Sequence, residues 1–179
     1  MRRKLFVITI AFIVVFLFVA CDSASQLSDN ISQTVARTTQ GEIEVSAGKP
    51  NSTQWFDFTI EHVKKTASYA GYSPADGYML IDVLITQKGT FDDTEPVPMG
   101  TFDFYMDSSI FEESIYPIPP IDDTMMPGEF DLVYGETAVY HMVYEIPSDI
   151  PDLKLMFTEW DEGGREGATF VMVINPGGL

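Results

Sequence analysis

Hydrophobic and polar residues alternate along most of the chain after Trp55, as they do in β-strands that bury one face. The alternation predicts six strands, near residues 56–61, 78–86, 102–107, 137–146, 153–158 and 169–174. Two more strands are expected near residues 110–116 and 130–134. The strand at 78–86 carries Leu80, Asp82 and Leu84 opposite an apolar face, and this near-continuous apolarity favours a central strand.

Turn-forming residues separate these segments, and no stretch combines a helical period of 3.6 residues with helix caps. Examples are Ser73-Pro74, Asp76-Gly77, Pro127-Gly128 and Gly163-Gly164. We therefore predict an all-β protein in which residues 55–179 form an antiparallel, immunoglobulin-like β-sandwich. A closed barrel is the alternative arrangement.

Residues 1–20 have the layout of a secretory signal peptide. Arg2, Arg3 and Lys4 precede an uncharged apolar run, Leu5–Ala20. As a helix this run would span only about 24 Å, whereas the hydrocarbon core of a bilayer is about 30 Å thick. An export signal is therefore favoured over a permanent membrane span.

The segment Phe18-Val19-Ala20-Cys21 resembles the lipobox of bacterial lipoproteins, in which an invariant cysteine follows a small residue. Phe18 stands where that motif usually has Leu. The resemblance implies that the Cys21 sulfur receives a diacylglyceryl group and that cleavage makes Cys21 the first residue. Two acyl chains are enough for stable membrane anchoring. Cys21 is the only cysteine, so neither an internal disulfide nor a cysteine-rich zinc site is expected.

Residues 21–54 are predicted to comprise the lipidated cysteine and a flexible tether. The segment after Cys21 is rich in Ser, Thr, Gln, Asn and Asp, and its large apolar residues are too few to stabilise a helix. As a random coil the tether would span on the order of 30 Å. Such a tether would hold the domain away from the membrane.

The excess of acidic over basic residues excludes some classes of binding partner. The 179 residues include 27 acidic and 10 basic side chains, which give a net charge of −17. Phosphate backbones would repel this surface, so no nucleic acid partner is expected. An anionic bilayer would repel it too, so contact with the membrane is expected through the lipid on Cys21.

No group of residues has the arrangement of a catalytic centre, and we predict no catalytic residues. The alternation places His62 on the inner face of its strand and His141 on the surface, with Glu145 two positions further along the same face, four residues away. Their spacing does not indicate a shared metal ion. No serine lies in a Gly-x-Ser-x-Gly elbow, and Cys21 lies outside the domain. The chain is therefore not expected to be an enzyme or to bind a cofactor.

Acidic loop residues are the remaining candidates for chemistry. Asp92, Asp93, Asp122 and Asp123 offer oxygen ligands of the kind that Ca²⁺ prefers. None of them lies in the spaced Asp-x-Asp-x-Asp-Gly pattern of a calcium-binding loop. Solvated acidic loops are expected in so negative a chain, and a Ca²⁺-binding structural domain is the alternative function.

Three segments occur in the order seen in one known family. They are "GYMLIDVLI" at residues 77–85, "FDFYMD" at residues 102–107 and the block Met126–Phe157, which includes "VYEIP". This order resembles the family called domain of unknown function 4352, over residues 55–175. The resemblance implies an immunoglobulin-like domain of exported lipoproteins in Gram-positive bacteria, and it brings no catalytic residues.

These observations together predict a lipoprotein anchored by diacylglyceryl-Cys21 on the outer face of the cell membrane of a Gram-positive bacterium. The sandwich is expected to act as a binding module for a protein or another envelope or extracellular ligand. The sequence does not indicate which one.

Overall fold

The computed structural model describes residues 41–92, 95–160 and 166–179. The predicted signal peptide, Cys21 and the first part of the predicted tether, up to residue 40, lie outside these residues. No helix within the described ranges has the length and hydropathy needed to cross a bilayer.

The described residues form strands and two short 3₁₀ helices. The strands are β1 (Gly41–Glu44), β2 (Pro50–Ser52), β3 (Phe56–Thr66), β4 (Tyr78–Gly89), β5 (Val97–Met99), β6 (Phe104–Asp107), β7 (Phe130–Leu132), β8 (Thr137–Pro147), β9 (Leu153–Trp160) and β10 (Glu166–Ile174). The 3₁₀ helices are η1 (Thr101–Asp103) and η2 (Pro176–Gly178).

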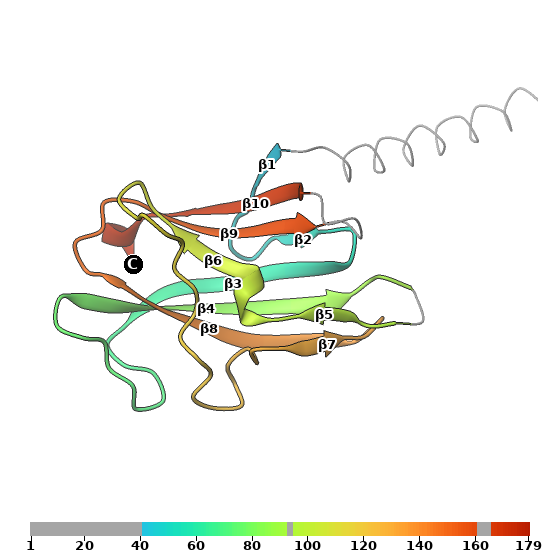
Figure 1. The fold of residues 1–179 in the computed structure, drawn as a ribbon, viewed down its shortest axis with the longest axis horizontal. Coiled ribbons are helices and arrows are strands. Elements are labelled where there is room, and N and C mark those ends of the chain that lie inside the picture. The colour runs from blue at the N-terminus through green and yellow to red at the C-terminus, as the bar shows by residue number, and fades with distance from the viewer. Residues whose placement is uncertain (1–40, 93–94, 161–165) are drawn as a thin grey trace, which may run out of the picture. The chain divides into compact units, whose positions relative to one another are not determined.

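Two four-stranded sheets face each other across one core (Figure 1). One sheet has the order β1-β10-β9-β6 and the other β2-β3-β4-β8, while β5 and β7 form a separate pair. All neighbouring strands are antiparallel except β1, which runs parallel to β10. The prediction of an all-β, antiparallel sandwich is confirmed, and the described strands do not close into a barrel.

The six predicted strands are all present, and β4 is central as expected. Near residues 130–134 the structure has β7, but residues 110–116 contain no strand and only Ile115 makes a bridge, to Met106. Near residues 102–107 the strand begins later than predicted, because η1 occupies its start. Phe102 in that helix is exposed.

The boundary between tether and domain is corrected by the structure. Residues 41–54 were predicted to belong to the tether, but they include β1 and β2, and Val45 is buried in the core. These two strands are short and polar, so their own sequence gives little sign of a strand. They are stabilised by pairing with β10 and β3, which are longer and bury apolar side chains in the core.

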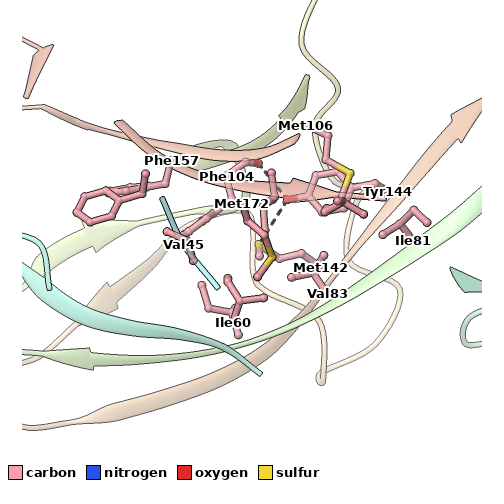
Figure 2. Close-up of a cluster of buried hydrophobic side chains, with 14 of the residues drawn as sticks. Val45, Ile60, Ile81, Val83, Phe104, Met106, Met142, Tyr144, Phe157 and Met172 are labelled. Carbon is pink, nitrogen blue, oxygen red and sulfur yellow. Dashed lines mark hydrogen bonds between the residues drawn. The ribbon is translucent and has the colours of Figure 1, made fainter. Parts of the chain in front are cut away.

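The core lies between the inner faces of the two sheets (Figure 2). Phe58 on β3 packs edge-on against Phe104, Phe157 and Phe170 of the opposite sheet, with ring centroids 5.3–6.2 Å apart. Tyr144 on β8 is the largest fully buried side chain, and its hydroxyl donates to the backbone oxygen of Phe104 at 3.3 Å. Burial raises the pKa of Tyr144 well above its usual value. The core therefore locks the two sheets together through aromatic contacts.

The outer face of the β2-β3-β4-β8 sheet is partly covered as well. The β3–β4 and β6–β7 connections both extend on this side of the sheet in Figure 1. They bring Tyr69, Tyr72 and Ile118 onto a second buried cluster, made by Leu80, Met125 and Val143. The middle of this sheet is thus covered on both faces, and Asp82 on its outer face is shielded from solvent.

Candidate functional site

A β-bulge in β3 decides where His62 points. Ile60 pairs with Ile85 on β4, but the next residue of β4, Leu84, pairs with His62, so Glu61 is an extra residue. The bulge shifts the alternation by one position, and Val63 instead of His62 continues the inner face. The prediction of an inward His62 is wrong for this reason: the side chain lies on the outer face of the sheet.

The strand register then brings His62, Asp82 and His141 together. Leu84 on β4 pairs with His62 on one side and with His141 on the other. Asp82 lies two residues along β4 on the same face, diagonal to both histidines, which is within reach of long side chains. Three neighbouring strands therefore place two imidazoles around one carboxylate, and we call these residues the His-Asp-His cluster.

Asp82 is the centre of the cluster. Its side chain is 2% exposed, and Oδ1 lies 2.7 Å from Nδ1 of His141. Oδ2 lies 3.0 Å from Nζ of Lys64, its cross-strand partner, and 4.0 Å from Nε2 of His62. A buried carboxylate is stable only with such partners, because burial strongly disfavours an isolated charge.

His62 is less completely satisfied. Its side chain is 38% exposed, yet the Nε2 atom itself is buried and has no hydrogen-bond partner in the described part of the chain. The two imidazole rings lie 6.2 Å apart between centroids. The cluster therefore contains one buried nitrogen that lies 4.0 Å from a buried carboxylate and makes no hydrogen bond among the described residues.

The β3–β4 and β6–β7 connections contribute polar groups around His141. The backbone of His141 donates to Thr124 O and accepts from Met126 N–H, both at 2.9 Å, so the β6–β7 connection runs along the edge of β8. Tyr69 packs against the His141 ring at 5.4 Å, and its hydroxyl lies 2.8 Å from Thr124 Oγ1. Partial burial raises the pKa of Tyr69.

Of the acidic loop residues predicted as calcium candidates, Asp92, Asp122 and Asp123 belong to no group of possible metal ligands within the described residues. Among residues 41–92, 95–160 and 166–179, the group of three or more His, Cys, Asp or Glu side chains close enough to hold a metal ion is the His-Asp-His cluster. Asp122 instead accepts hydrogen bonds from the hydroxyl and N–H of Thr124, and these lower its pKa. Asp93 and Cys21 lie outside the described residues.

The sequence prediction missed Asp82, although it is the one acidic residue in the strand Tyr78–Gly89 and is surrounded there by apolar residues. A charge at such a position requires partners, and here they come from β3 and β8. The carboxylate that the sequence placed near His141 was Glu145, on its own strand. Glu145 is engaged elsewhere, because it accepts hydrogen bonds from the Tyr72 hydroxyl and the Ala75 N–H.

A second site is an aromatic cleft at the end of the sandwich where β5 pairs with β7. Its volume is about 490 Å³, and its lining includes Trp55, Phe91, Pro96, Asp103 and Trp160. Trp55 packs edge-on against Phe91 at 4.6 Å and donates its indole N–H to the backbone oxygen of Trp160. The cleft has the size and the apolar, aromatic lining of a small-ligand site.

Two carboxylates add negative charge to the otherwise apolar lining of the cleft. Glu95 and Asp103 both line it, and Asp103 Oδ2 accepts a hydrogen bond from Gly100 N–H at 2.7 Å. Burial raises the pKa of Asp103 in spite of this hydrogen bond. The aromatic faces and the carboxylates together favour a ligand with an apolar body and a positive charge.

The sequence matches no family model and no curated protein. Solved structures resemble it in fold. The "putative lipoprotein" YcdA of Bacillus subtilis matches 74% of this chain at 13% identity with a TM-score of 0.56, and the match spans 40% of that longer chain. An uncharacterized β-sandwich protein of Clostridium difficile matches 76% of this chain and 97% of its own at 16% identity, with a TM-score of 0.51.

The YjhA protein of Bacillus subtilis matches 73% of this chain and 99% of its own at 14% identity, with a TM-score of 0.56. Identities this low show a shared fold. They support the β-sandwich described above and leave the function to be argued from the chain's own residues.

Proposed function

We propose that this chain is a lipid-anchored extracytoplasmic lipoprotein whose β-sandwich is a binding module. Cys21 would carry the lipid, on the outer face of the membrane of a Gram-positive bacterium. The lipobox-like sequence after an apolar export signal supports the anchor. The fold shared with the YcdA protein is in keeping with it, and so is the proposed relationship to domain of unknown function 4352.

The observation that carries the binding role is the aromatic cleft, which both tryptophans of the chain line. Its ligand would be an aromatic or aliphatic group with a positive charge, displayed by a protein or another envelope component. Asp103 and Glu95 would attract the charge, while Trp55, Phe91 and Trp160 would contact the apolar part. The net charge of −17 would favour the approach of such a ligand.

The proposal is for binding and not for catalysis. A catalytic centre would need a nucleophile with its base, or an acid and a base that flank an open pocket. The cleft offers carboxylates beside aromatic rings, which suits recognition of a cation. The acidic loops of Asp92, Asp122 and Asp123 form no cluster of ligands in the described residues, so calcium binding is not proposed.

The anchor is tested by the substitution Cys21→Ala in the producing cell. Labelling with an alkyne-tagged fatty acid should modify the natural chain and leave the variant unlabelled, and the variant should move from the membrane fraction to the medium. A natural chain that takes up no label and stays in the membrane, as the variant does, would show that Leu5–Ala20 remains as a span, and would contradict the lipid anchor.

The cleft is tested by tryptophan fluorescence of the full chain, because Trp55 and Trp160 are its only tryptophans. Phenethylamine should cause a saturable change in emission, and the neutral analogue 2-phenylethanol should bind several-fold more weakly. Asp103→Asn should remove most of this difference. The absence of a saturable change with either compound at millimolar concentration would overturn the cleft as the ligand site.

The matched variants Phe91→Ala and Tyr134→Ala distinguish ligand binding in the cleft from binding to any exposed aromatic side chain. Phe91 lines the cleft, whereas Tyr134 is exposed and is not among the lining residues. Phenethylamine binding should weaken in Phe91→Ala and stay unchanged in Tyr134→Ala. Equal weakening in both variants would contradict the assignment.

A further inference from the structure

We propose that the His-Asp-His cluster binds one divalent transition-metal ion, of which Zn²⁺ is the representative. His62 Nε2, a carboxylate oxygen of Asp82 and His141 Nδ1 would be its three protein ligands. The site shares no residue with the aromatic cleft. The inference is therefore independent of the binding role proposed above.

The geometry of the three ligand atoms supports a metal site. They all lie within 4.8 Å of one another. Zinc–ligand bonds of about 2.0–2.1 Å place the ligand atoms of a tetrahedral site about 3.3 Å apart. His62 Nε2 lies 4.0 Å from Asp82 Oδ2, whereas His141 Nδ1 lies 2.7 Å from Asp82 Oδ1. Metal binding would therefore require side-chain rotations that bring both nitrogens to about 3.3 Å from the same oxygen.

The chemistry of the ligand set selects the kind of ion. Two neutral imidazoles and one carboxylate form the ligand set of zinc sites that keep a fourth position for water, and they also suit nickel, cobalt and copper. Calcium is disfavoured, because it requires six to eight oxygen ligands. An ion of charge +2 would also stabilise the buried Asp82 carboxylate better than its present partners do.

The absence of a hydrogen bond to His62 Nε2 among the described residues is the second observation. Nε2 is buried and lacks a hydrogen-bond partner among the described residues, although the ring could turn toward solvent. Such a nitrogen is destabilising unless something binds it. A metal ion between His62 and Asp82 would satisfy both groups at once.

Lys64 would compete with the metal ion for the place beside the Asp82 carboxylate. Its ammonium lies 3.0 Å from Asp82 Oδ2, and its side chain is 54% exposed, so it can withdraw into solvent. An incoming ion would replace one positive charge by two beside the same carboxylate. His141 must present an unprotonated Nδ1, so in the neutral ring its proton would reside on Nε2 when the metal is bound.

The direct test is a titration of the full chain, purified without a histidine tag, with Zn²⁺ in competition with a chromophoric chelator. One ion should bind per chain. His62→Ala and His141→Ala should each weaken binding by about 100-fold or more, since even indirect partners of metal ligands contribute 10- to 100-fold. Replacing Zn²⁺ by Co²⁺ should give the visible absorption bands of a four-coordinate site, and these should vanish in both variants.

Matched controls distinguish zinc binding at the cluster from zinc binding to acidic groups elsewhere on the surface. His62 and His141 are the only histidines in the chain, and Asp122→Asn removes a nearby exposed carboxylate that is not one of the three ligands. Asp122→Asn and Cys21→Ala should therefore leave the affinity within about twofold. Zinc bound equally well by His62→Ala, His141→Ala and the natural chain would overturn the proposal, as would the absence of zinc binding by the natural chain.

The pair Lys64→Gln and Lys65→Gln tests the mechanism without removing a ligand. Lys65 follows Lys64 on β3 and pairs with Ile81, not with Asp82. Lys64→Gln should tighten Zn²⁺ binding roughly 3- to 10-fold, because a competing positive charge is removed from the site, whereas Lys65→Gln should change it little. Weaker binding in Lys64→Gln, in protein with an unchanged circular dichroism spectrum, would contradict this arrangement.

Discussion

At the scale of single residues, the clearest departure from ordinary core chemistry is Gln87. It lies on the inner face of β4 and is fully buried, and neither its Nε2 nor its Oε1 has a hydrogen-bond partner among the described residues. An unsatisfied buried amide is destabilising by about 1–3 kcal/mol. Its neighbours along the inner face, Val83 and Ile85, are apolar, so nothing in the surrounding alternation accounts for a glutamine here.

The substitution Gln87→Leu should therefore stabilise the protein, because it replaces the amide by an apolar group of similar volume. We expect the free energy of unfolding to rise by about 1–2 kcal/mol, measured by urea denaturation. The isosteric control Gln87→Glu should have the opposite effect, since it buries a charge. A Gln87→Leu variant that is less stable than the natural chain would show that the amide has a partner.

Glu145 gives a prediction for the dependence of stability on pH. The hydrogen bond from the Tyr72 hydroxyl, followed by that from the Ala75 N–H, lowers its pKa from the ordinary value of 4.5. The folded state therefore holds the carboxylate more strongly than the unfolded state does. This stabilisation is complete above the ordinary pKa and is lost as the pH falls through the lowered one.

Glu145→Gln keeps an acceptor for Tyr72 but cannot titrate. The melting temperature of the natural chain should fall more steeply below pH 4.5 than that of Glu145→Gln, as followed by circular dichroism. The control Glu112→Gln changes a carboxyl on an exposed residue and should retain the slope of the natural chain. Parallel curves for the natural chain and Glu145→Gln would contradict the assigned hydrogen bonds.

At the scale of elements, the sequence predicts the long strands well and the details that build the site poorly. Alternation alone located β3, β4, β8, β9 and β10, because each buries one face over many residues. The bulge at Glu61 was missed, although the apolar phase moves from Ile60 to Val63 and so records it. The cluster was missed because its three members meet only through the register of separate strands, which is a tertiary property.

The register makes a prediction about deletions in β3. Removing Glu61 should join Ile60 directly to His62 in a regular ladder with the pairing they already have, opposite Ile85 and Leu84. Stability should change by no more than about 1–2 kcal/mol, and His62 should stay on the outer face, with the zinc affinity retained.

Removing Thr59 from the same strand is the matched control. It should move Phe56 and Phe58 to the wrong face of the sheet, and the melting temperature should fall sharply. A Glu61 deletion as damaging as the Thr59 deletion would show that the bulge itself is required for folding.

At the scale of the whole molecule, the excess of acidic residues should be visible in the response to salt. A net charge of −17 at pH 7 causes self-repulsion in the compact state, and ions screen it. The melting temperature at pH 7 should therefore rise when NaCl is increased from near zero to about 0.3 M, where the screening length falls below about 10 Å.

The same titration near pH 4.1, the isoelectric point of the sequence, is the internal control. The net charge there is close to zero, and the melting temperature should respond little to NaCl. A rise of equal size at both values of pH would assign the effect to general exclusion of salt from the protein surface, and not to charge.

The edges of the two sheets affect how readily neighbouring copies of the protein on a membrane would aggregate. The edge of β8 is covered by the chain at Thr124 and Met126, β6 is bridged by Ile115, and the outermost strands β1 and β2 have only four and three residues. A protein held on a membrane by a lipid meets copies of itself much more often than one that diffuses in three dimensions. Because these edges are covered or short, they offer crowded neighbours little template for joining their sheets, and dense display on a cell should cause little β-sheet aggregation through them.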